Sequence, residues 1–284
     1  MAKKKRKKLK IFLSVLLVIV LGTVMIVVPP MLTETIDNSW SLSSKSDSPP
    51  LMVAHRGLSS LAPENSIPAL EKAAEYGFDG YEFDIHTTKD GEWVVIHDDT
   101  VDKMTDGTGF VADMTLEEIR QLRLDAGKGI ENYTELRVPT LEEALSVCKD
   151  KDIFPVIEIK SCDPERLPAL IELLEDKALI DKAVLIAFNG EYLEKCRELN
   201  KDIQMLLLAV SPEKADIDWC IEHNAGINFC YAYLALSAPA ISYARKNDVK
   251  IGVWTVDNIV FEDIMVLFGA EIITTNKLLP VTEG

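Results

Sequence analysis

The sequence predicts an α/β fold: a (β/α)8 TIM barrel with a small insertion after its second strand, preceded by a single N-terminal transmembrane helix. Three observations support this prediction. Apolar, β-branched runs alternate with helical patterns from Leu51 onward, one connection is much longer than the others, and the chain begins with a long uncharged segment. At 284 residues, one barrel of ordinary size accounts for most of the chain.

The first 50 residues divide into three predicted parts. Residues 1–10 form a basic tail without an acidic residue. Residues 11–28 carry no charge, and at about 1.5 Å per residue they span roughly 27 Å, close to the hydrocarbon thickness of a bilayer. Pro29 and Pro30 end this helix, and residues 29–50 are typical of an exposed linker rich in Ser, Asp and Pro.

The apolar segment 11–28 has two readings, a retained anchor and a cleaved signal peptide. A signal peptide has a shorter apolar core and a small-residue cleavage site, which residues 31–34 do not offer. We therefore expect a single-pass anchor in the cell membrane. The positive-inside rule places residues 1–10 in the cytoplasm and the barrel, residues 51–284, outside.

The charge balance excludes one class of partner. Seven of the 30 basic residues lie in the first ten, so the remainder holds 23 against all 46 acidic residues. Such a surface repels nucleic acid. A phosphate ligand must therefore be attracted by local cations or by a metal. The sequence does not indicate an oligomeric state.

Eight strand candidates alternate with helix candidates, as in a parallel barrel. The strands are expected at 51–54, 80–85, 153–159, 183–188, 203–209, 226–230, 250–255 and 271–274. The helices are expected at 66–76, 141–149, 164–176, 190–200, 212–223, 238–247 and 258–268. An open doubly wound sheet is the alternative, because a count of strands does not prove closure.

The connection at residues 87–140 is too long for a simple crossover. It contains an apolar run at 93–96, a stretch rich in Asp, Thr and Gly at 98–109, and a helical pattern at 115–122. We expect an insertion over the barrel mouth that carries His97 into the site.

Three carboxylates lie at strand positions that favour metal binding. Glu82 and Asp84 are one residue apart, so both point to the same face of a strand, where burial would require a cation between them. Glu158 closes another very apolar run and could complete an oxygen-ligand site for Mg²⁺ or Ca²⁺. Lys160, on the same face as Glu158, could contact a phosphate oxygen. The alternative for the first pair is an outward, solvated position.

Two histidines, His55 and His97, directly follow apolar runs at predicted strand ends. A single histidine there is often only a hydrogen-bonded core residue. Two of them, with the guanidinium of Arg56 available for a phosphate oxygen, favour acid–base cleavage of a phosphodiester. His86 shares a strand face with the first two carboxylates, where a supporting role is favoured over metal ligation.

These residues belong to an ordered series of motifs. The chain resembles the glycerophosphodiester phosphodiesterases over residues 51–280. The matching motifs are His55-Arg56-Gly57, Pro63-Glu64-Asn65-Ser66, Glu82-Phe83-Asp84, Thr88-Lys89-Asp90-Gly91, His97-Asp98, Thr108-Gly109, Pro139-Thr140-Leu141-Glu142-Glu143, Glu158-Ile159-Lys160 and Val253-Trp254-Thr255-Val256-Asp257.

The resemblance implies a TIM barrel that hydrolyses glycerophosphodiesters to sn-glycerol 3-phosphate and an alcohol. In that family the glycerol 2-hydroxyl attacks phosphorus and leaves a cyclic phosphate that water opens. The resemblance assigns roles as follows: one divalent cation, Mg²⁺ or Ca²⁺, on Glu82, Asp84 and Glu158; acid–base catalysis by His55 and His97; phosphate binding by Arg56 and Lys160; orientation of His55 or the ligand by Glu64 and Asn65; and a pocket wall at Trp254.

Three positions depart from the family pattern. Lys103 stands where arginine is usual, and Ala187 replaces the serine before Phe188. The last strand normally ends in Thr-Asp followed by proline, whereas residues 274–277 read Thr-Thr-Asn-Lys. The missing acid is not one of the implied metal ligands, so the implied activity stands, and substrate preference or packing near the mouth could differ.

Three alternatives remain open from the sequence: lysophospholipase D-type activity, cleavage of polyglycerol-phosphate polymers, and a non-catalytic glycerophosphate-binding relative. A lipid enzyme needs an apolar groove, for which Tyr231, Tyr233, Leu234 and Leu236 are candidates; ordinary packing is the other reading of these residues. Binding alone has no need of two acid–base histidines, which favours an enzyme.

Overall fold

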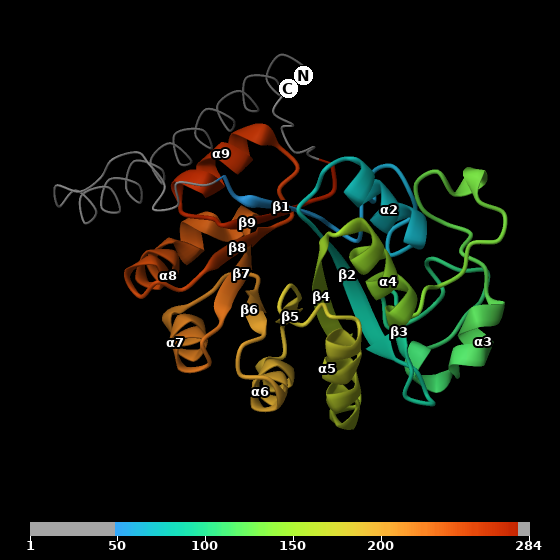
Figure 1. Ribbon diagram of the computed structural model, residues 1–284. Coiled ribbons are helices and arrows are strands. Elements are labelled where there is room, and N and C mark those ends of the chain that lie inside the picture. Colours follow the sequence, from blue (N-terminus) through green and yellow to red (C-terminus); the bar gives the residue numbers. More distant parts are fainter. Residues whose placement is uncertain (1–48, 278–284) are drawn as a thin grey trace, which may run out of the picture.

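The computed structural model describes residues 49–277, in which parallel strands form a closed barrel surrounded by helices (Figure 1). The predicted tail, the anchor and nearly all of the linker lie in residues 1–48, outside this range. Among the described residues, no helix has the length and apolar character needed to cross a bilayer.

The barrel contains eight parallel strands within the described range. The first strand, β1, pairs with the last, β9, on one side and with β2 on the other, which closes the sheet and excludes the open doubly wound alternative. The strands are β1 (Leu51–Ala54), β2 (Gly80–Thr87), β4 (Phe154–Ser161), β5 (Val184–Ala187), β6 (Gln204–Ala209), β7 (Gly226–Cys230), β8 (Ile251–Trp254) and β9 (Ile272–Thr275).

The helices that connect the strands lie on the outside of the barrel (Figure 1). They are α2 (Ile67–Glu75), α4 (Leu141–Lys151), α5 (Leu167–Asp176), α6 (Gly190–Leu199), α7 (Lys214–Glu222), α8 (Leu234–Lys246) and α9 (Ile259–Leu267). The prediction for α8 was wrong at its start, because Pro239 lies inside the helix rather than near its beginning. A 3₁₀ turn over Tyr231–Tyr233 leads into α8 four residues before the predicted start at residue 238.

Successive side chains along each barrel strand point alternately into the barrel and outward to the helices, and both faces are buried. Outward side chains such as Phe83 and Ile157 pack against the helices. Inward side chains form a separate apolar cluster in the barrel interior: Val53, Val156, Val184, Ile186, Leu206, Leu208 and Ile272. We call this cluster the apolar plug. Glu82 and Glu158 also point into the barrel, so the polar site lies directly beyond the plug, toward the C-terminal ends of the strands.

The insertion has its own small core. Its short strand β3 (Trp93–Val95) pairs antiparallel with the end of β2, and α3 (Leu116–Gln121) follows. Its buried side chains are Val94, Ile96, Val101, Met104, Val111, Ile119, Leu124 and Val138. Figure 1 shows the insertion beside β2 and α4 rather than across the mouth. It does carry His97 into the site, as expected, with Nε2 3.3 Å from Nζ of Lys160. The guanidinium of Arg120 holds α3 there through two hydrogen bonds to the Glu143 carboxylate of α4, at 2.8 and 2.9 Å.

We predict that Gly57→Ala destabilises the fold by about 2–4 kcal/mol, combining backbone strain with overpacking. Gly57 follows β1 with φ +72°, and an added Cβ would lie 2.6 Å from the carbonyl carbon of Ala69 in α2. Urea denaturation of the purified protein measures this change. Gly109→Ala is the control, because that glycine also has a positive φ but meets only Met114, at 3.9 Å. Equal losses in both variants would contradict the packing contribution.

Candidate active site

The end of β1 places His55 and Arg56 between two neighbouring strands. The backbone N–H of His55 donates to the carbonyl of Thr275 at the end of β9, at 2.8 Å. The backbone N–H of Arg56 donates to the Glu82 carboxylate on β2, at 2.9 Å. Arg56 adopts the left-handed backbone conformation, with φ 56°. The chain therefore turns sharply at the mouth, with both side chains at the C-terminal ends of the strands.

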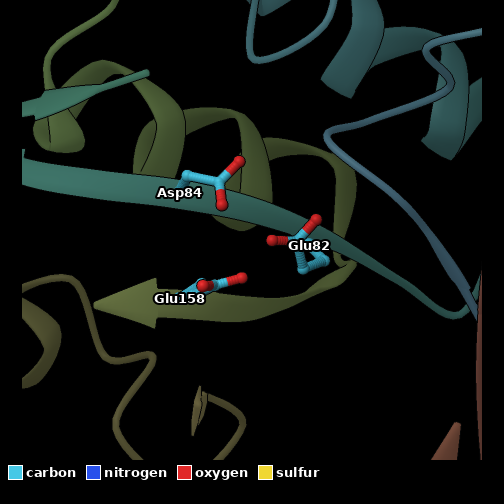
Figure 2. Close-up of side chains that lie close together, drawn as sticks. All are labelled: Glu82, Asp84 and Glu158. Atoms are coloured by element: carbon cyan, nitrogen blue, oxygen red, sulfur yellow. The ribbon is translucent and has the colours of Figure 1, made fainter. Parts of the chain in front are cut away.

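Glu82, Asp84 and Glu158 converge in the barrel interior, as Figure 2 shows. One carboxylate oxygen from each lies within 4.8 Å of the others. Glu82 and Asp84 are almost fully buried, and Oε1 of Glu82 and Oδ1 of Asp84 have no hydrogen-bond partner. The outward, solvated alternative is therefore wrong. Unpartnered buried oxygens of this kind fit a hard divalent cation, so this group could hold a metal ion.

Burial and neighbouring negative charge raise the proton affinity of Glu82 and Glu158. Burial, followed by the charges of Asp84 and Glu158, raises the pKa of Glu82 well above its ordinary value. Burial and the neighbouring Asp84 raise the pKa of Glu158 to about 7, although Lys160 opposes this shift. Without a cation, the cluster therefore retains protons near neutral pH.

Two cationic side chains flank the carboxylates. Nζ of Lys160 lies 2.9 Å from Oε1 of Glu158 and 3.8 Å from Oδ1 of Asp84. Nε of Arg56 lies 3.5 Å from Oδ2 of Asp84. Both side chains remain partly exposed, so each can reach a phosphate oxygen of a bound ligand while it offsets the buried negative charge.

Glu64 and Asn65 support the cluster rather than His55. Nδ2 of Asn65 donates to Oδ2 of Asp84 at 2.8 Å, and Oδ1 of Asn65 accepts from the Asp84 backbone N–H at 3.2 Å. Oε1 of Glu64 accepts from both Arg56 and Lys103, each at 2.9 Å. The lysine that replaces the usual arginine therefore helps to hold Glu64. The predicted role for these two residues was orientation of His55 or of the ligand; their hydrogen bonds go to Arg56 and Asp84, and orientation of the ligand stays a prediction.

His97 lies two residues beyond the end of the insertion's strand β3 and beside Lys160, with 3.3 Å between Nε2 and Nζ. Its Nδ1 lies 2.6 Å from Oδ1 of Asp98. Nε2 of His86 lies 3.1 Å from the backbone carbonyl of His97. His86 is buried, and it holds the loop that carries His97. The pKa of His86 is lowered, chiefly by burial.

His55 faces Glu82 with one ring nitrogen and Asn276 with the other. Nε2 lies 3.9 Å from Oε2 of Glu82, and Nδ1 lies 2.8 Å from Oδ1 of Asn276. Burial, followed by the charge of Arg56, lowers the pKa of His55. Sequence reasoning noted the changed residue at 276 but did not place it in the site. The sequence offers one signal for it: residue 276 lies just after the last predicted strand, and barrel active sites lie at the C-terminal strand ends.

Aromatic side chains form the other side of the mouth. The indole N–H of Trp254 donates to the carbonyl of Asn228 at 3.2 Å, and its ring makes an edge contact with Phe188, with centroids 5.9 Å apart. Tyr231 packs on Phe261 at 5.2 Å. The two sides of the mouth therefore differ: polar on β1, β2 and β4, and largely apolar beyond β5, β7 and β8.

A cavity of about 990 Å³ opens at the opposite, N-terminal end of the barrel strands. Its lining includes Leu51, Phe154, Gln204 and Lys250, but none of the predicted site residues. Function in parallel barrels resides at the C-terminal strand ends, where the histidines and carboxylates lie. We therefore assign the active site to that end.

A barrel with acid–base groups, cations and a carboxylate cluster at its C-terminal strand ends belongs to the class of (β/α)8 hydrolases that act on phosphate esters. The model of the glycerophosphoryl diester phosphodiesterase family matches residues 55–278. The chain belongs to this family, and so is a phosphodiester hydrolase.

Individual relatives agree with this membership. The chain is 37% identical over 238 residues to a glycerophosphodiester phosphodiesterase of Caldanaerobacter subterraneus, covering 80% of this chain and 93% of that protein. It is 32% identical to a glycerophosphodiester phosphodiesterase of Bacillus subtilis, covering 73% and 77% of the two chains. Among solved structures, an Oleispira antarctica phosphodiesterase in complex with the product sn-glycerol-3-phosphate has a TM-score of 0.73 at 26% identity, covering 80% of this chain and 93% of that one.

We predict that divalent cations bind more tightly as pH rises from 6 to 8. Protons on Glu82 and Glu158 compete with the cation below the raised carboxyl pKa values, and the competition fades above them. The apparent Kd for Mg²⁺ or Ca²⁺ should fall about tenfold per pH unit for each proton displaced. Calorimetric titration in buffers of different ionisation enthalpy measures both quantities. Glu158→Gln should flatten the dependence, and a pH-independent Kd without proton release would contradict the assignment.

Proposed function

We propose that this protein hydrolyses glycerophosphodiesters to sn-glycerol 3-phosphate and an alcohol, using one divalent cation, Mg²⁺ or Ca²⁺. The observation that carries the proposal is the convergence of two histidines and two cationic side chains on a buried three-carboxylate cluster. Family membership and the product found in the Oleispira relative support the substrate class.

The ligand set for the cation is Glu82, Asp84 and Glu158, whose unpartnered buried oxygens have the right chemistry for it. When bound, the cation supplies Lewis-acid stabilisation of negative charge on the phosphate. Arg56 and Lys160 add fixed positive charge beside the same group. The acidic surface of the domain makes this local positive charge necessary for the binding of an anion.

In the first step, the glycerol 2-hydroxyl attacks phosphorus while Nε2 of His55 takes its proton. The new oxygen–phosphorus bond forms as the bond to the alcohol breaks, and His97 donates a proton to the departing oxygen. In the second step, His97 removes a proton from water. The water oxygen bonds to phosphorus as the bond between phosphorus and the glycerol 2-oxygen breaks, which opens the cyclic phosphate. His55 then returns its proton to the 2-hydroxyl, so both histidines regain their starting states.

Single-chain lipid substrates are a second candidate, favoured by exposed apolar side chains near the mouth. Leu236 at the start of α8 is 71% exposed, and Val260 at the start of α9 is 59% exposed. Tyr233 and Phe188 are also substantially exposed. These residues follow the strands on the apolar side of the mouth, where an acyl chain attached to the glycerol could lie.

We predict chelator-sensitive release of glycerol 3-phosphate from glycerophosphocholine or glycerophosphoethanolamine, restored by Mg²⁺ or Ca²⁺. An enzyme-coupled assay of the product measures it. Lysophosphatidylcholine and polyglycerol phosphate are assayed in parallel. Turnover of lysophosphatidylcholine alone would replace the main proposal with the lipid one. Absence of turnover on every substrate, by protein shown to be folded, would favour a binding protein.

We predict that His97→Ala lowers kcat by about 10²–10⁴-fold, the range for loss of a general acid–base group. Thermal unfolding should change little, because the imidazole of His97 is partly exposed at the mouth. His223→Ala is the matched control: that ring stacks on Trp219 outside the site, so its loss should leave kcat unchanged. Normal turnover by His97→Ala would remove this residue from the mechanism.

We further propose that residues 11–28 anchor the barrel domain outside the cell membrane. The support is their uncharged length beside a basic tail, residues 1–10. Protease treatment of intact spheroplasts tests this topology, since an extracytoplasmic barrel should be cleaved or shed and a cytoplasmic one protected.

A further inference from the structure

The side-chain amide of Asn276, directly after β9, lies between His55 and the carboxylate of Asp257 and contacts both. Oδ1 of Asn276 faces Nδ1 of His55 at 2.8 Å, and Nδ2 donates to Oδ2 of Asp257 at 2.8 Å. The other oxygen of Asp257 accepts from the backbone N–H of Asn276 at 2.8 Å and from Oγ1 of Thr275 at 3.0 Å. The Asp257 carboxylate is thereby fixed by the last residue of β9 and the residue that follows it.

Hydrogen-bond chemistry fixes the orientation of the Asn276 amide. An ionised carboxylate only accepts hydrogen bonds, so the end of the amide that faces Asp257 must be the NH₂ group. The end that faces His55 is then the carbonyl oxygen. Oγ of Ser59 donates to the same oxygen at 3.2 Å, which is consistent with this orientation.

A carbonyl oxygen cannot donate, so Nδ1 of neutral His55 must carry the proton and Nε2 must carry the lone pair. Nε2 is the nitrogen that faces the carboxylate cluster, 3.9 Å from Oε2 of Glu82. We infer that Asn276, oriented by Asp257, is a positioning residue that holds His55 in the Nδ1–H tautomer and so presents a proton acceptor to the substrate hydroxyl. The inference rests on the proposed function for the step that it serves.

Asn276 and Asp257 are chemically matched. The single change Asn276→Asp would place two carboxylates in contact with no proton between them. The single change Asp257→Asn would place the NH₂ group of the new side chain against the NH₂ group of Asn276. In the second case the amide of Asn276 must turn, which places its NH₂ on Nδ1 of His55 and moves the ring proton to Nε2. Exchanging the two residues restores every donor–acceptor pair.

The tautomer is read directly by ¹⁵N NMR of the full chain labelled in its histidine rings, at neutral pH with Mg²⁺ present. The chain has four histidines, and the spectrum of His55→Gln identifies the signals of His55. We expect Nδ1 of His55 to have the shift of a protonated nitrogen and Nε2 that of an unprotonated one. Asp257→Asn should exchange the two. An Nε2–H tautomer in the wild type, or no exchange in Asp257→Asn, would overturn the inference.

Kinetics provide the second readout. Asp257→Asn should lower kcat by about 10²-fold or more with little change in KM, because the loss is one of proton transfer. The exchanged variant, Asp257→Asn with Asn276→Asp, should recover most of that loss. Ser59→Ala is the matched control, since it removes another donor to the same oxygen while leaving the tautomer in place, and its kcat should stay near that of the wild type.

Two kinetic results would show a merely structural contribution and overturn the inference. One is a kcat of the exchanged variant no higher than that of Asp257→Asn, and the other is a loss of kcat in Ser59→Ala as large as that in Asp257→Asn. If the wild type turns over none of the substrates, the proposed function fails. The NMR result then still decides whether Asn276 sets the tautomer of His55.

Discussion

Closure of the barrel between β1 and β9 is the constraint on which the site depends. The register pairs Ala54 with Thr275, and the backbone N–H of His55 continues that pairing with a bond to the carbonyl of Thr275. His55 is thereby held beside Asn276, 221 residues away in the chain. On its other side β1 pairs with β2, which brings Arg56 to the Glu82 carboxylate. A site that combines β1, β2, β4 and β9 exists only because the sheet returns to its first strand.

The charge arrangement at the mouth reflects ligand binding more than stability. Burying carboxylates without full hydrogen bonding is costly, and a well-packed apolar core would be more stable. In this protein the apolar interior of the barrel lies next to the carboxylates, on the side of the N-terminal strand ends. Val156 is the inward-facing residue that precedes Glu158 on β4. Arg56 and Lys160 offset part of the negative charge, but Oε1 of Glu82 and Oδ1 of Asp84 accept no hydrogen bond. Such an arrangement has the chemistry to hold a cation.

Local patterns predicted much of the fold and of the site. Alternating apolar runs predicted every barrel strand and the general place of each helix, because burial imposes its period on the sequence. The start of α8 was misplaced because Pro239 resembles a helix beginning, and only packing of the preceding turn shows otherwise. The side of the barrel on which the insertion lies also escaped prediction. The pairing of β3 with β2 and the hydrogen bonds between Arg120 and Glu143, which are 23 residues apart, hold it there, and neither contact has a local signature in the sequence.

What the sequence by itself determined is which residue types lie at strand ends and on which face. Period-two spacing put Glu82 and Asp84 on one side of β2, and the motif series identified the family. The tertiary structure decided which side chains contact each other. Asn65 is hydrogen-bonded to Asp84, Glu64 is hydrogen-bonded to Arg56, and Asn276 faces His55. Hydrogen-bond partners across a closed barrel are set by strand register and closure, which are properties of the whole sheet. No window of neighbouring residues contains that information.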